Sequence, residues 1–129
     1  VDAGIDLFDC SQRRFWEPTF EGSDLNFAGW TRKVTGVPTM TVGSVGLDSD
    51  LMESFVEGRV AERNIASLHE LAERFDRGEF DLVAVGRALI AEPDWANHLR
   101  NGEFDKLKPY SHSVLAHLRE ALDAATAAE

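Results

Sequence analysis

The chain alternates between short apolar runs and longer stretches in which apolar residues recur at helical spacing. The apolar runs are typical of strands buried in a parallel sheet, and they cover 5–9, 37–42 and 82–85. The helical patterns follow each run, at 23–35, 64–77, 93–100 and from 113 onward. The order strand, helix, strand, helix, strand, helix predicts an α/β fold whose parallel strands are joined by right-handed crossovers.

Residues with capping preferences mark the ends of two of these helices. Ser23 is a candidate N-cap for the first, and Gly36 a candidate stop. Asn64 and Gly78 take the same roles for the second. Further along, Pro93 suits the first turn of a helix that Asn101-Gly102 closes.

Two segments have a weaker pattern. Residues 47–63 are of mixed character, with Gly58 interrupting a possible helix, so we expect an irregular or partly helical insertion. The tail, 113–129, carries Val114, Leu115, Leu118 and Leu122 on one stripe, and we expect a terminal helix that frays at its end over DAATAAE.

Length and composition indicate a single domain, 1–129, with a packed core, because 43% of the 129 residues are hydrophobic. The net charge of −10 argues against binding to nucleic acid or to an anionic membrane. A single cysteine, Cys10, fits a reducing cytoplasm, and no apolar run approaches a membrane span. We expect a soluble cytoplasmic protein without a metal site. Its start, VDAGIDLFDCS, reads as the continuation of another segment.

The candidate chemistry lies where the three strands end. Carboxyl ends of parallel strands meet at one edge of a sheet, which would bring together 9–14, 43–46 and 86–91. Glycine at 43, 46 and 86 lets backbone N–H groups approach an anion, and Arg87 adds a cationic fork suited to phosphate. The alternative is that the glycines only form turns and that Arg87 pairs with Glu92 or Asp94.

Two stretches, VPTMTVGSVG and FDLVAVGRALIAEPDWANHLRNGE, resemble the last two strands of the Old Yellow Enzyme family of flavin-dependent ene-reductases. The most specific motif is V-G-R-x-x-[IL]-A-x-P-D, and IDLFDCS looks like the sixth strand of the same barrel. The resemblance implies the C-terminal portion of a (β/α)8 TIM barrel that binds FMN, from about strand six to strand eight with their helices.

The same resemblance implies roles for individual residues. Gly43, Ser44, Gly86 and Arg87 would bind the FMN phosphate, with the Arg87 side chain pairing with it or lying near the flavin ring. The loop QRRFWEP would wall the substrate pocket, so that Arg14, Phe15 and Trp16, together with Arg13, would contact substrate or the dimethylbenzene edge of the flavin. The alternative for these four is a packed aromatic or a solvated arginine.

The implied activity is transfer of hydride from NAD(P)H through FMN to an activated alkene. No catalytic residue is expected in this chain, because the family's substrate-gripping His pair and proton-donating Tyr belong to earlier strands. Tyr110 has no motif support, and we expect the helical His69, His98 and His117 at the surface. The 129 residues alone are therefore expected to be inactive.

Three strands of a closed barrel leave two unpaired edges, so we expect a partner that covers them. It would be the missing N-terminal barrel half, in the same polypeptide or a separate chain, or further copies in a homo-oligomer. Two other functions stay open: a non-catalytic phosphate-binding half-barrel that acts as an assembly module, and a different phosphate-binding barrel enzyme.

Overall fold

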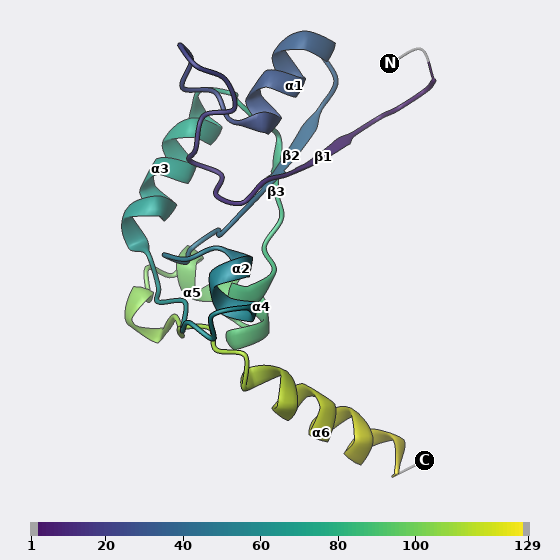
Figure 1. Ribbon diagram of the computed structural model, residues 1–129, viewed down its shortest axis with the longest axis vertical. Helices are drawn as coiled ribbons and strands as arrows, with labels where there is room; N and C mark the ends of the chain where they lie inside the picture. Colours follow the sequence, from purple (N-terminus) through teal and green to yellow (C-terminus); the bar gives the residue numbers. More distant parts are fainter. Residues whose placement is uncertain (1–2, 128–129) are drawn as a thin grey trace.

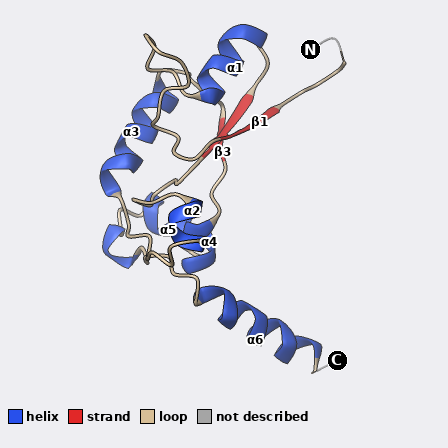
Figure 2. Cartoon of the chain, viewed as in Figure 1, coloured by secondary structure: helices blue, strands red, loops and turns tan. Residues whose placement is uncertain are grey.

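The computed structural model describes residues 3–127 and has a mixed α/β architecture built on one small parallel sheet (Figure 2). The strands are β1 (Phe8–Ser11), β2 (Thr39–Val42) and β3 (Leu82–Val83), in the order β1-β2-β3. Both pairs are parallel, with Phe8 opposite Thr39 and Met40 opposite Leu82. The predicted α/β class and parallel sheet are confirmed.

The first strand lies further along the chain than the predicted 5–9. Its ladder begins where the Phe8 N–H donates to the Pro38 carbonyl at 3.0 Å. Proline has no N–H to extend the ladder in the other direction, so the pairing with β2 starts at Thr39. Ile5 and Leu7 precede the ladder and are exposed.

The helices follow the strands and fill three places around the sheet. They are α1 (Phe27–Thr35), α2 (Leu51–Phe55), α3 (Ile65–Asp76), α4 (Arg87–Ala91), α5 (Trp95–Arg100), the 3-10 helix η1 (Phe104–Lys106) and α6 (Val114–Thr126). Helix α1 packs against β1 and β2. Figure 1 shows α1 and α3 beside the strands, α2, α4 and α5 beyond the strands' carboxyl ends, and α6 projecting away from the rest.

The N-cap of α1 lies three residues later than predicted. Asn26, rather than Ser23, is the N-cap: its Oδ1 accepts from the Gly29 N–H at 2.8 Å. Asn26 is fully buried, and its Nδ2 donates to the Phe15 carbonyl and the Thr41 hydroxyl, so tertiary contacts fix the cap. Ser23 instead accepts from the Leu25 N–H in the preceding turn.

The other predicted helix ends are mostly confirmed. Gly36 takes a left-handed conformation with φ 68° at the end of α1, and the Asn64 side chain caps α3 through the Ser67 N–H. Pro93 lies in the turn before α5, which begins at Trp95 with Asp94 as N-cap. Helix α4, which starts directly after Gly86, was not predicted, because five residues are too short for a periodic pattern.

The insertion 47–63 is partly helical, as predicted. Asp50 caps α2 in a capping box: its Oδ1 accepts from the Met52 and Glu53 N–H groups, and Glu53 accepts from the Asp50 N–H. The chain then returns through single bridges between Leu47 and Arg63 and between Ala61 and Tyr110. The start of α2 lies at the carboxyl ends of the strands, where Leu51 and Met52 line one cavity together with Gly43 and Gly86.

Helix α6 is regular to Thr126, further than the predicted fraying over 123–129 implies; residues 128 and 129 lie outside the described residues. The side chains of Leu118 and Leu122, predicted to share its stripe, also lie outside them.

The core lies between the helices and the sheet, and its largest fully buried apolar side chains are Phe15, Leu47, Phe80 and Tyr110. Within residues 3–127, β1 and β3 each pair with β2 alone, so both sheet edges are open in this chain. None of the helices described is long and apolar enough to cross a membrane.

Candidate functional site at the carboxyl ends of the strands

A cavity of about 440 Å³ opens where the three strands end, as the sequence predicts for a parallel sheet. Residues that follow β1, β2 and β3 all contribute to it, together with the start of α2. Its lining includes Gln12, Arg13, Gly43, Ser44, Asp50, Leu51, Met52, Gly86 and Arg87. Four residues expected at the phosphate site, Gly43, Ser44, Gly86 and Arg87, are thus brought together from segments more than forty positions apart.

The space around the Cα atom differs among Gly43, Gly46 and Gly86. A Cβ on Gly43, whose φ is 154°, would lie 2.5 Å from the Gln12 carbonyl oxygen. A Cβ on Gly46 would lie 3.1 Å from the Trp95 ring, and Gly46 does not line the cavity. Only Gly86 faces open space. Internal packing alone therefore favours glycine at 43 and 46, and of these two only Gly43 lines the cavity.

Four residues that line this cavity have backbone N–H groups without an acceptor from the described chain. Among the described residues, the N–H groups of Gly43, Ser44, Gly86 and Arg87 make no hydrogen bond. Backbone N–H groups of folded proteins are almost always paired, with water where no protein acceptor is near. The cavity therefore offers a set of hydrogen-bond donors to solvent or to an acceptor-rich ligand.

The Arg87 guanidinium donates to four uncharged oxygens, three of them in the insertion. Its Nη1 donates to the Asp50 carbonyl at 3.0 Å and the Ser54 hydroxyl at 2.7 Å. Its Nη2 donates to the Ser49 carbonyl at 2.7 Å and the Ser44 hydroxyl at 3.3 Å. Burial lowers the pKa of Arg87, although nearby Tyr110 and the carboxylates of the insertion oppose the shift.

Neither of the carboxylates considered as partners of Arg87 pairs with it. Glu92 binds Lys108 at 2.6 Å, and Asp94 accepts from the Asn97 side chain. Within residues 3–127 no carboxylate lies within ion-pair distance of Arg87. The alternative in which Arg87 simply forms a local ion pair is therefore wrong for those two residues.

A network of ion pairs fixes the insertion beside the cavity. The buried Asp50 Oδ2 lies 2.9 Å from Arg13 Nη2 and 3.1 Å from Arg14 Nη2, without hydrogen-bond geometry to either. Arg14 also binds Glu53 at 2.8 Å, and Arg59 binds Glu53 from the other side. Burial would raise the pKa of Asp50, but the N–H groups of α2 and the two arginines outweigh it and hold that pKa below its usual value.

The three residues expected to touch substrate do not gather at the cavity. Arg14 is engaged in the ion-pair network, Phe15 is fully buried in the core, and Trp16 packs edge-on against Phe15 at 5.1 Å. None of the three lines the cavity, whereas Arg13, with a side chain 64% exposed, does. In this structure the three side chains take part in packing and ion pairing.

Sequence reasoning missed the contribution of the insertion. Asp50, Leu51, Met52 and Ser54 all lie at or beside the cavity. The pattern Asp50-x-x-Glu53 is a capping-box signature, and it could have placed the short helix. No local signal indicates that Arg87 would bind this helix from 37 positions away.

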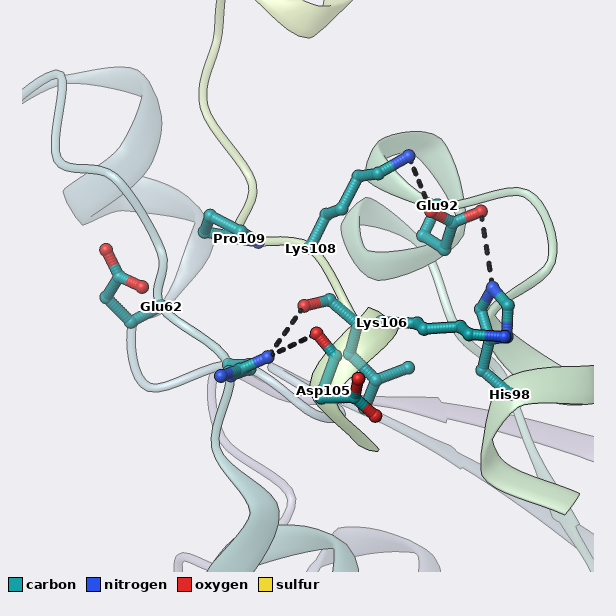
Figure 3. A pocket seen from close by; sticks show the side chains of 9 residues that line it. Glu62, Glu92, His98, Asp105, Lys106, Lys108 and Pro109 are labelled. Atoms are coloured by element: carbon teal, nitrogen blue, oxygen red, sulfur yellow. Dashed lines mark hydrogen bonds and ion pairs between the residues drawn. The ribbon is translucent and has the colours of Figure 1, made fainter. Parts of the chain in front are cut away.

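A second cavity, of about 690 Å³, lies between the return of the insertion and the segment after α5 (Figure 3). Several of its polar side chains have partners: Glu92 binds Lys108, and His98 lies 2.8 Å from Glu103 beside the cavity. His98 is half-buried there, which corrects its expected place at the surface, whereas His69 is exposed. Because several of its charged groups are already paired within the chain, this cavity is a weaker candidate than the one at the strand ends.

No protein-family model matches this sequence, and the comparison with curated proteins returns no significant relative.

Proposed function

We propose that this chain is the C-terminal part, about strands six to eight with their helices, of an FMN-dependent oxidoreductase barrel, and that its strand-end cavity binds the FMN phosphate. The observation that carries the proposal is the set of unpaired N–H groups of Gly43, Ser44, Gly86 and Arg87 around one cavity. Phosphate offers several acceptor oxygens to converging donors, and the loops after strands seven and eight bind phosphate in many barrels.

Charge supports an anionic ligand. The charged residues that line the cavity are Arg13, Arg87 and Asp50, which sum to one positive charge, although the whole chain carries −10. A cavity that is locally positive in an acidic protein favours a small anion over a polyanion such as nucleic acid, which the rest of the surface would repel.

The rest of the lining suits an organic group attached to the phosphate. Leu51 and Met52 stand at the cavity with 53% and 52% of their surface exposed. The capping box and the Arg87 contacts hold these side chains in place, so they do not turn into the core. Ligand sites combine such apolar walls with a few polar groups that fix orientation.

In the proposed reaction FMN supplies the redox chemistry, taking hydride from NAD(P)H and delivering it to an activated alkene. The residues of this chain bind and orient: the strand-end N–H groups fix the phosphate end, and Leu51 and Met52 exclude water beside it. The open edges of β1 and β3 receive the remaining strands of the barrel. The assembly-module alternative uses the same phosphate site without turnover.

The first experiment is a visible absorption spectrum of the desalted protein, followed by titration with FMN and with riboflavin, which lacks the phosphate. We expect FMN to bind more tightly than riboflavin, and inorganic phosphate to compete with FMN alone. Equal affinity for the two flavins, or no binding of either, contradicts the phosphate site. FMN binding without NAD(P)H-dependent reduction of an enone by the barrel-complete protein favours the assembly module.

A further inference from the structure

We propose that the side chain of Arg13, and not that of Arg87, is the ionic partner of the bound phosphate, an inference that rests on the proposed function above. In this assignment Arg87 contributes its backbone N–H and acts otherwise as a positioning residue for the insertion. Both arginines line the same cavity, but their side chains differ in the hydrogen bonds and ion pairs that they already make with the protein.

The Arg87 guanidinium is committed to the protein. Its two Nη atoms carry four hydrogens, and they meet four oxygens, from Ser44, Ser49, Asp50 and Ser54. Two of these acceptors are carbonyls of the segment that enters α2, at 2.7 and 3.0 Å. To form a bidentate pair with phosphate through its Nη atoms, Arg87 would leave buried acceptors unpaired, which is costly.

Arg13 is available by comparison. Its side chain is 64% exposed, and its one ionic partner among the described residues is Asp50. Its backbone is fixed at the site, because its carbonyl oxygen lies 2.9 Å from the Ser44 hydroxyl. A long, exposed cation on a fixed backbone can turn from one acceptor to another without any change in the fold.

The buried Asp50 carboxylate keeps a cationic partner and two hydrogen-bond donors when the Arg13 side chain moves away. Its Oδ2 keeps Arg14 at 3.1 Å, and its Oδ1 keeps the N–H groups of Met52 and Glu53. Exchange of the Arg13 partner from Asp50 to phosphate therefore replaces one ion pair by another with a more highly charged anion. The same exchange by Arg14 would remove it from both Asp50 and Glu53.

The test compares affinities for FMN and riboflavin in the purified protein and in the variants Arg13→Ala, Arg13→Lys and Arg87→Lys, with flavin fluorescence as the readout. Arg59→Ala is the matched control, because Arg59 belongs to the same ion-pair network and does not line the cavity. For Arg13→Ala we expect about tenfold weaker FMN binding, the loss of one charge-assisted contact, with riboflavin affinity unchanged. Arg13→Lys should recover most of this loss.

For Arg87→Lys we expect the affinities for both flavins to fall together, because the wall formed by the insertion is loosened. Arg59→Ala should change neither affinity. The inference is overturned if Arg13→Ala keeps the preference of the unmodified protein for FMN over riboflavin, or if Arg87→Lys abolishes that preference while riboflavin affinity stays unchanged. A protein that shows no preference for FMN before any substitution refutes the proposed function itself, and this assignment with it.

Discussion

Arg87 Nη2 lies 3.3 Å from the Oγ of Ser44, a residue 43 positions earlier in the chain. This contact joins the end of β3 to the end of β2 across the mouth of the cavity. It is one of four hydrogen bonds from the same guanidinium, and the other three go to Ser49, Asp50 and Ser54 in the segment that contains α2. The shape of the candidate site therefore depends on one side chain.

The first prediction concerns the stabilising role of Arg87. Arg87→Ala leaves the Ser49 and Asp50 carbonyls without their donor, and we expect the free energy of unfolding to fall by roughly 2 to 4 kcal/mol. Urea unfolding followed by circular dichroism measures it. Arg100→Ala removes an exposed arginine whose side chain, among the described residues, hydrogen-bonds to Asn97 alone, and it should change stability by less than about 0.5 kcal/mol. Equal effects of the two substitutions would contradict the role of Arg87.

The second prediction concerns the buried cap of α1. Asn26→Ala removes the cap of Gly29 and the donor to the Phe15 carbonyl, and it should cost roughly 2 to 4 kcal/mol of stability. Asn26→Asp keeps the oxygen that accepts from the Gly29 N–H but loses the Nδ2 donor to the Phe15 carbonyl. The loss of stability should therefore differ between the Asp and Ala variants. Ser23→Ala should be within about 0.5 kcal/mol of the unmodified chain. A larger loss at Ser23 than at Asn26 would restore Ser23 as the cap.

The third prediction separates two costs of replacing glycine. At Gly58, with φ 68° and open space around it, alanine should cost about 1 kcal/mol, the penalty for a left-handed conformation. At Gly43 the added Cβ also meets the Gln12 carbonyl at 2.5 Å, so we expect a loss of at least about 3 kcal/mol. Chemical denaturation of both variants gives the difference. Similar losses would mean that the loop after β1 moves away freely.

The fourth prediction is a dependence of stability on pH. Hydrogen bonds from the Arg32 guanidinium and the Thr39 N–H lower the pKa of Asp81, which connects β2 to the start of β3. A lowered folded-state pKa means that the unfolded chain takes up the proton first. The stability from Asp81 is thus present above the ordinary carboxyl pKa of about 3.9 and is lost as the pH falls through the lowered value.

Urea midpoints measured from pH 6 down to pH 2 test this assignment. Asp81→Asn should be less stable than the unmodified chain at pH 6, and its midpoint should fall less steeply with acid. Asp6→Asn, at an exposed position before β1, should follow the unmodified chain throughout. If both variants have the same slope, Asp81 makes no contribution to the acid sensitivity.

Capping residues and periodic apolar patterns predicted the helix ends that depend only on nearby residues. Asn64 and Gly36 lie at the ends of periodic segments, and they cap and close their helices as predicted. Ser23 also had the right chemistry, but Asn26 has tertiary partners in Phe15 and Thr41, and these decided the cap. A capping preference read from sequence contains no information about such partners.

The candidate site was predictable only in part, for the same reason. Parallel pairing brings Gly43 and Gly86 to one edge, and the alternation of strands and helices predicts that pairing. The burial of Phe15 and the hydrogen bonds from Arg87 to the insertion depend on how segments distant in the sequence pack together. The sequence of this loop therefore could not distinguish residues that enter the core from residues that line the cavity. Phe15 is buried in the core, whereas Arg13 lines the cavity.

The parallel sheet also has a consequence for how the chain folds. Phe8 pairs with a residue 31 positions later, and Met40 with one 42 positions later, so no strand pair forms from neighbouring residues. Long loops must close before these contacts form, which slows folding relative to a helical protein of this length. During synthesis, β1 and β2 can meet as soon as Val42 leaves the ribosome, but the strand ends around the cavity stay incomplete until residue 87 follows. Helix α3 emerges between these two points of synthesis, before residue 87.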